Sequence, residues 1–190
     1  NTKALAAMAQ AQLQAKDLEK AIEFAQKLNA ADRDNRIAAY VLAEVYLQKR
    51  EWAAAIASLE AVKRRAPLSP YSYQHLAKIY VQLGQPELAL PNLIELHRRT
   101  MNDPQYARQI AEISESLKQY DQALTYYGEI PLINPYEVSA YESMAAIHLQ
   151  RREFPLALAQ IERVVQADPS SADGWSKVAM IRYQIGRAHV

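Results

Sequence analysis

Three histidines are the first side chains in this sequence that could bind a metal ion or transfer a proton. His75, His97 and His148 fall at different positions of the helical pattern described below, and no His-Glu-x-x-His motif joins two of them. The chain has no cysteine, so it offers neither a thiolate ligand nor a cysteine nucleophile. We therefore expect no metal site and no cofactor.

Glu112 and Glu115 are the carboxylates best spaced for acid–base chemistry. They lie three residues apart, which places both on one face of a helix, where such a pair can act as general acid and base. No pocket-forming segment accompanies them, so we interpret them as solvated carboxylates. The four glycines are isolated and form no phosphate-binding loop. We find no catalytic motif and do not expect an enzyme.

Glutamine recurs in one register, and Ser116 interrupts the series once. The residues are Gln14, Gln48, Gln82, Gln150 and Gln184. Such a column would form a ladder of amides able to pair with the backbone of a bound ligand. Glutamine is also a good helix former at an exposed helix end, and we favour this second interpretation.

A repeat of 34 residues positions all of these side chains. Small residues recur at Ala9, Ala43, Ala77, Ala111, Ala145 and Ala179, and again at Ala21, Ala55, Ala89, Ala123 and Ala157. Bulky apolar residues keep the same register at Met8, Leu42, Leu76, Ile110, Met144 and Val178, and at Leu28, Val62, Leu96, Ile130 and Val164. Four columns in one register predict a tandem array of identical structural units.

Each repeat is predicted to be a pair of amphipathic helices. In residues 37–49 and 52–65 the apolar side chains recur at helical spacing. The alanine columns allow two helices to approach closely, because a small side chain lets the ridges of one helix enter the grooves of the other. We expect Pro91 to bend its helix, and Gly128 with Pro131 to end another helix near Ile130.

The pattern resembles the tetratricopeptide repeat. The match is carried by Tyr73, Leu76, Ala77 and Tyr80 with Ala89 and Leu93, and by Trp175, Val178 and Ala179. Alanine replaces the usual small glycine, and Arg33 and Met101 replace the closing proline. The resemblance covers five units at 2–35, 36–69, 70–103, 104–137 and 138–171, followed at 172–190 by the first helix of a sixth, truncated unit.

This resemblance implies an all-α fold, an α-solenoid in which tandem antiparallel helix pairs form a right-handed superhelix. It also implies that the first helix of each repeat lines a concave groove, with an apolar, tyrosine-bearing centre around Tyr40, Leu47 and Tyr71. The side chains expected to bind a peptide there are Gln10, Gln14, Tyr40, Glu44, Leu47, Gln48, Tyr71, Gln74, Lys78, Gln82, Arg108, Glu112, Glu142 and Gln150.

The charge balance bears on the class of partner. The net charge of the chain is +1, which does not supply the basic face of a nucleic-acid binder. The second repeat carries +3 and the fourth −3, a polarity that could orient a protein partner. The carboxylate clamp of chaperone-binding relatives needs Lys, Asn and Arg at fixed first-helix positions. Neither Ala6 with Gln10 nor, one register later, Gln74 with Lys78 reproduces it. No segment is long and apolar enough to insert into a membrane.

We therefore predict a protein-interaction scaffold whose groove binds a peptide or a partner helix of a protein. The alternative is a non-catalytic appendage of a larger, envelope-associated bacterial enzyme whose catalytic domain lies outside this sequence. The chain begins with Asn1, and we interpret it as a piece of a longer protein. The last six residues, 185–190, resemble a translated sequencing adapter and are interpreted as non-native. The compartment stays open between cytoplasm and periplasm.

Overall fold

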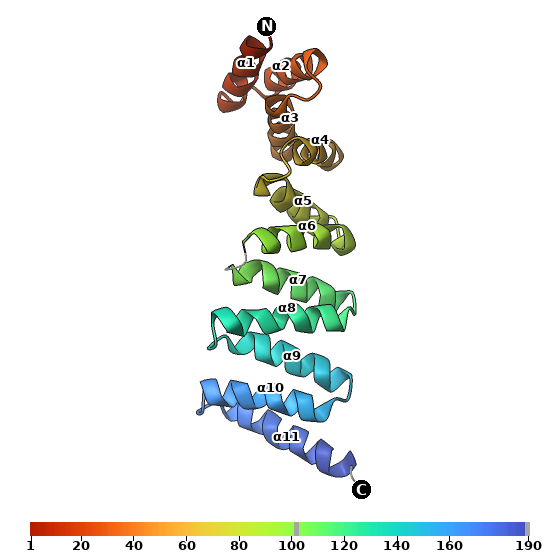
Figure 1. Cartoon of the computed structure of the whole chain (residues 1–190), viewed down its shortest axis with the longest axis vertical. Coiled ribbons are helices and arrows are strands. Elements are labelled where there is room, and N and C mark those ends of the chain that lie inside the picture. Colours follow the sequence, from red (N-terminus) through yellow and green to blue (C-terminus); the bar gives the residue numbers. More distant parts are fainter. Residues whose placement is uncertain (101–102, 189–190) are drawn as a thin grey trace. The chain divides into compact units, whose positions relative to one another are not determined.

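Every regular element that the structure describes is an α-helix. The structure is a computed structural model, and it describes residues 1–100 and 103–188. The helices follow one another along the chain (Figure 1) as α1 Thr2–Gln14, α2 Leu18–Ala31, α3 Arg36–Lys49, α4 Trp52–Arg65, α5 Pro70–Gln82, α6 Pro86–Arg99, α7 Pro104–Ser116, α8 Tyr120–Ile133, α9 Val138–Gln150, α10 Phe154–Ala167 and α11 Ala172–Ala188. Met101, His189 and Val190, on which sequence interpretations rest, lie outside the described residues.

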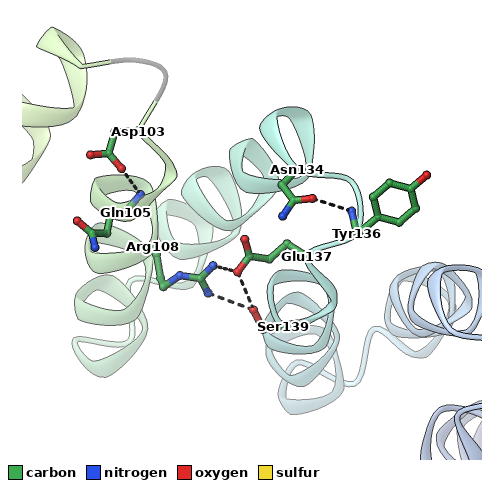
Figure 2. Close-up of polar contacts among 7 residues, drawn as sticks. All are labelled: Asp103, Gln105, Arg108, Asn134, Tyr136, Glu137 and Ser139. Carbon is green, nitrogen blue, oxygen red and sulfur yellow. Dashed lines mark hydrogen bonds and ion pairs between the residues drawn. The ribbon is translucent and has the colours of Figure 1, made fainter.

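The first helices of the repeats start at residues 2, 36, 70, 104, 138 and 172, each 34 residues after the last. Local signals fix several of these starts. Asn35 accepts hydrogen bonds from the backbone N–H groups of Ile37 and Ala38, at 3.0 and 3.2 Å. Asp103 caps α7 in the same way through the N–H of Gln105 at 2.9 Å (Figure 2), and a proline fills the first position of α5 and of α7.

The same turn ends five of the first helices. In each turn one residue has a positive φ near 60°, and the next residue donates its N–H back across the last helical turn. This is the Schellman arrangement, and it usually places glycine at the left-handed position. Here only one of the five is glycine, and the other four are basic: Lys16, Arg50, Gly84, Lys118 and Arg152.

The chain divides into two compact bodies, which we call the N-terminal body (Asn1–Leu96) and the C-terminal body (from His97 onward). In the N-terminal body α1 packs on α2 and α3, and contacts continue from α2 to α3, α3 to α4 and α4 to α5. In the C-terminal body α7 to α11 stack in chain order, each against the next (Figure 1). Among the described helices, none is long and apolar enough to cross a membrane.

Alanine and branched apolar residues fill both bodies in the predicted register. The two small columns are buried at Ala9, Ala43, Ala77, Ala111 and Ala145 and at Ala21, Ala55, Ala89, Ala123 and Ala157. The bulky residues Leu28, Val62, Leu96, Ile130 and Val164 are buried beside them. The exceptions lie in the first and last helices, where Met8 and Ala179 of the predicted columns are exposed. This repeated packing of tandem helix pairs is the core of an all-α solenoid.

The predicted end of α8 is wrong. The helix passes Gly128 and Pro131 and continues to Ile133. Pro131 removes one backbone hydrogen bond, but the last turn is closed behind it by the N–H of Asn134, which donates to the carbonyl of Ile130 at 3.0 Å. Ile130 itself is fully buried and anchors this turn in the core. Helix α6 likewise runs unbroken through Pro91, where a bend stays a prediction.

Candidate functional site

Three aromatic rings gather on the first-helix face of the N-terminal body. Tyr40 of α3 and Tyr71 of α5 have ring centroids 4.7 Å apart, and Tyr71 stacks in turn on His75 at 4.5 Å. Both contacts are tilted, with interplanar angles of 40° and 50°. Tyr40 is 41% exposed, so the group presents an aromatic surface to solvent. We call Tyr40, Tyr71 and His75 the aromatic cluster.

Glu44 of α3 orients the aromatic cluster through a hydrogen bond to Tyr71. The hydroxyl of Tyr71 donates a hydrogen bond of 2.7 Å to Oε1 of Glu44. Burial raises the pKa of Tyr71 well above its usual value, and the Glu44 carboxylate adds to that rise. Burial lowers the pKa of His75 below 6.5, with Glu44 opposing and Lys78 reinforcing the shift. His75 is therefore a neutral aromatic ring at neutral pH.

A pocket of about 490 Å³ adjoins the cluster. His75 belongs to both, since it also lines the pocket. The pocket, which we call the α3–α5 pocket, is lined by Leu47, Arg50, Trp52, His75, Lys78, Ile79 and Gln82. Its floor is apolar, and its polar groups are two cations, an amide and an imidazole. This composition suits an apolar side chain with polar or charged neighbours.

Six residues that were predicted from the sequence lie together in the aromatic cluster, beside it or in the pocket: Tyr40, Glu44, Leu47, Tyr71, Lys78 and Gln82. Four other residues of this region were not predicted to bind a peptide: His75, Arg50, Trp52 and Ile79. His75 had a signal, because it lies one helical turn after Tyr71 on the same face of α5. Arg50 and Trp52 gave no such signal, because they belong to the turn after α3 and to α4, whereas the predicted groove residues all lie on first helices.

The candidate glutamines do not converge on one place. They are spread over the four first helices α1, α3, α5 and α9, all with exposed side chains, namely Gln10, Gln14, Gln48, Gln74, Gln82 and Gln150. Of these, Gln82 lines the α3–α5 pocket. The amide ladder along the array stays a prediction.

Arg108 and Glu142, two of the four candidates in the C-terminal body, are already paired. The guanidinium of Arg108 makes an ion pair with Glu137 and donates to Oγ of Ser139 at 3.1 Å, so that α7 is joined to the start of α9 (Figure 2). Glu142 of α9 accepts a 2.9 Å bond from Lys177 of α11. A ligand at these positions would have to displace existing partners.

Glu112 and Glu115 do not form an isolated acid–base pair. Glu112 is exposed, whereas Glu115 accepts a 2.9 Å hydrogen bond from the hydroxyl of Tyr127. Burial and this carboxylate raise the pKa of Tyr127 to about 12. The contact makes Glu115 a structural partner of α8. Contrary to the expectation from the sequence, Glu115 also lines a pocket of about 400 Å³ together with Glu142 and Lys177.

Two further histidines contact carboxylates. His97 Nε2 lies 2.6 Å from Glu129, and His148 Nδ1 lies 2.7 Å from Glu153. Within residues 1–100 and 103–188, no group of three His, Cys, Asp or Glu side chains is placed to hold a metal ion.

Comparisons with known protein families match the N-terminal half of the chain. Family models of the tetratricopeptide repeat match residues 12–74 and 70–95. No curated protein matches the sequence.

Solved structures share the fold at low sequence identity. YrrB, a TPR protein with an unusual peptide-binding site, is 21% identical over 88% of this chain and 87% of its own, with a TM-score of 0.61. MamA AMB-1 is 18% identical over 93% and 97%, with a TM-score of 0.64. MamA from Desulfovibrio magneticus RS-1 is 13% identical over 90% and 97%, with a TM-score of 0.57. With its 34-residue helix pairs and these family matches, the chain is a tetratricopeptide-repeat protein.

Proposed function

We propose that this protein is a protein-interaction scaffold whose first helices bind a peptide or a partner helix. The scaffold consists of the five repeats at 2–35, 36–69, 70–103, 104–137 and 138–171. The binding surface with the strongest support is the aromatic cluster with the α3–α5 pocket beside it.

The aromatic cluster is the observation that carries the proposal. Tyrosine rings supply a large contact area and lose little conformational entropy on binding, because they rotate about only two side-chain bonds. Tyr71 is already oriented by its bond to Glu44, so less entropy is lost when a partner docks. Buried contacts that include alanines hold α3 and α5, the helices that carry the cluster, in place, so that the surface is preformed. YrrB, which shares the fold, has a peptide-binding site of its own.

Selection from a random peptide library tests the proposal. Peptides displayed on phage would be enriched on the wild-type chain and then measured by fluorescence anisotropy. We expect the double variant Tyr40→Ala with Tyr71→Ala to lose binding while its helical circular dichroism is unchanged. Tyr71→Phe, which keeps the ring and removes only the bond to Glu44, should retain most of the affinity.

The matched control removes two exposed tyrosines elsewhere. Tyr136 and Tyr183 are 79% and 64% exposed, and neither belongs to the aromatic cluster. The variant Tyr136→Ala with Tyr183→Ala should bind like wild type. Equal binding by the cluster variant, or failure of the wild-type chain to enrich any peptide, would refute the proposed surface.

A further inference from the structure

A second pocket that shares five lining positions with the first occurs three repeats later. Its other two lining residues are Met180 and Arg187, where those of the first pocket are His75 and Lys78. It has a volume of about 590 Å³ and lies between the turn after α9 and helix α11, so we call it the α9–α11 pocket. Five residues at equivalent repeat positions line both pockets, each pair 102 residues apart: Leu47 and Leu149, Arg50 and Arg152, Trp52 and Phe154, Ile79 and Ile181, Gln82 and Gln184. Each pocket belongs to one body of the chain.

In both pockets the backbone conformation of a turn fixes the position of the arginine. Arg50 and Arg152 occupy the left-handed position of the turn that ends α3 and α9, with φ values of 57° and 61°. Glycine adopts this conformation without steric cost, whereas any other residue is strained there. The turn fixes where each arginine leaves the backbone, at the rim of an apolar pocket.

Neither arginine is neutralised within the described part of the chain. No ion pair to Arg50, Arg152 or Lys78 occurs there. The acidic residues that follow the two arginines are engaged elsewhere. Glu51 lies 3.1 Å from Lys49, and Glu153 lies 2.7 Å from His148. Glu44, the acidic group that faces His75, accepts the hydroxyl bond of Tyr71.

We infer that both pockets bind acidic segments of a partner protein, in which a bulky apolar side chain lies next to a glutamate or aspartate. This inference rests on the proposed function and specifies its ligand. The leucine, isoleucine and aromatic side chains accept the apolar residue. The guanidinium at the rim pairs with the carboxylate in bidentate geometry, and the glutamine amide bonds the peptide backbone.

The recurrence indicates internal acidic residues rather than a C-terminal carboxylate. A partner chain has one C-terminus, which can occupy one pocket, but it can contain many acidic side chains. A nucleic-acid strand is a poor match, because each pocket combines two cations with apolar lining residues instead of forming a continuous basic track.

The test uses peptides blocked at both ends, with identical flanks and a Glu-Leu-Glu, Gln-Leu-Gln or Lys-Leu-Lys centre. A fourth peptide carries a neutral centre and a free C-terminal carboxylate. In anisotropy titrations at low salt, we expect the Glu-Leu-Glu peptide to bind about tenfold more tightly than its glutamine counterpart. Added salt should shrink that difference.

The decisive variant is Arg50→Gly with Arg152→Gly. It removes the arginine that both pockets share, at positions where glycine is unstrained, and leaves Lys78 and Arg187 in place. The melting temperature should not fall, and the preference for the acidic peptide should disappear. The matched control is Lys16→Gly with Lys118→Gly. It removes two cations from the same backbone position of other repeats, at residues that line neither pocket, and should keep the preference.

Several outcomes would overturn the inference. They are an acidic preference that survives the double arginine variant, a preference for the neutral or basic peptide, tighter binding of the free-carboxylate peptide, or tighter binding of a short oligothymidine strand. Absence of binding by all four peptides would also overturn it.

The proposed surface and the proposed acidic ligand can be refuted independently. If all charge classes bind equally and the Tyr40→Ala, Tyr71→Ala variant loses them all, the acidic ligand is wrong and the proposed surface stands. Because the α9–α11 pocket remains in that tyrosine variant, the second comparison is made with Arg152→Gly present in both proteins. If the tyrosine variant then binds the acidic peptide as tightly as Arg152→Gly alone, the cluster is not the binding surface and the α3–α5 pocket stands.

Discussion

The first-helix faces of the two bodies use the same repeat positions in opposite ways. Tyr40 and Tyr71 of the N-terminal body correspond in register to Arg108 and Ser139 of the C-terminal body. The tyrosines stack on each other and stay partly exposed, with Lys78 beside them lacking an ion pair in the described residues. Arg108 and Ser139 bond to Glu137, and Glu142 bonds to Lys177. One backbone frame therefore carries a face with partly exposed aromatic rings and a lysine without an ion pair in the described residues, and a face whose polar groups satisfy each other.

The two faces can be compared only if the helices of the two bodies pack in the same way. Placing a larger side chain in an equivalent helix contact of each body should give the largest effect on stability. Ala43 and Ala111 are equivalent alanines, both completely buried. Ala43→Leu and Ala111→Leu should each lower the free energy of unfolding by about 1–3 kcal/mol, because neither contact has room for three more carbon atoms. Urea denaturation followed by circular dichroism measures the loss. A wild-type unfolding curve for either variant would show that the frames differ.

The next test asks whether the paired cation matters to the fold more than the unpaired one. Arg108→Met should cost about 1 kcal/mol, since it removes an ion pair and leaves the half-buried Glu137 without its partner. Lys78→Met should change the free energy of unfolding by no more than about 0.5 kcal/mol. Equal losses for the two variants would contradict the distinction between a satisfied and an open face.

The smallest expected effect concerns pH. The pKa of His75 is depressed in the folded protein, so the unfolded chain binds more protons below pH 6.5. The neutral ring contributes its stability above that pH, and the contribution is lost as the pH falls through the folded-state pKa. His75→Gln should flatten the part of the stability profile that declines just below pH 6.5. An unchanged profile would mean that His75 is not desolvated in the cluster.

The repeat frame could be predicted because its determinants are local and periodic. A column such as Ala21 to Ala157 has one residue per repeat, and its burial follows from helix geometry alone. The predicted end of α8 was wrong because it followed from the hydrogen bond lost at Pro131 alone. The burial of Ile130 keeps the last turn of the helix in place.

The residues of the proposed binding surface that could be predicted from the sequence are those on first helices. Tyr40, Glu44 and Tyr71 were found because they share that face, whereas the α3–α5 pocket also needs Arg50 from a turn and Trp52 from a second helix. Arg108 was assigned to ligand binding for the same reason. Its partner Glu137 lies 29 residues away in a different turn, and only the folded structure brings the two charges together.

The basic residues in the left-handed turns have a consequence for how such a protein can evolve. The turn backbone accepts glycine without strain and accepts lysine or arginine at a cost of roughly 1–2 kcal/mol. A single substitution at residues 16, 50, 84, 118 or 152 can therefore add or delete a charge at a fixed site while the helices on either side keep their geometry. Specificity for charged partners can drift one repeat at a time, with no change in the core that all repeats share.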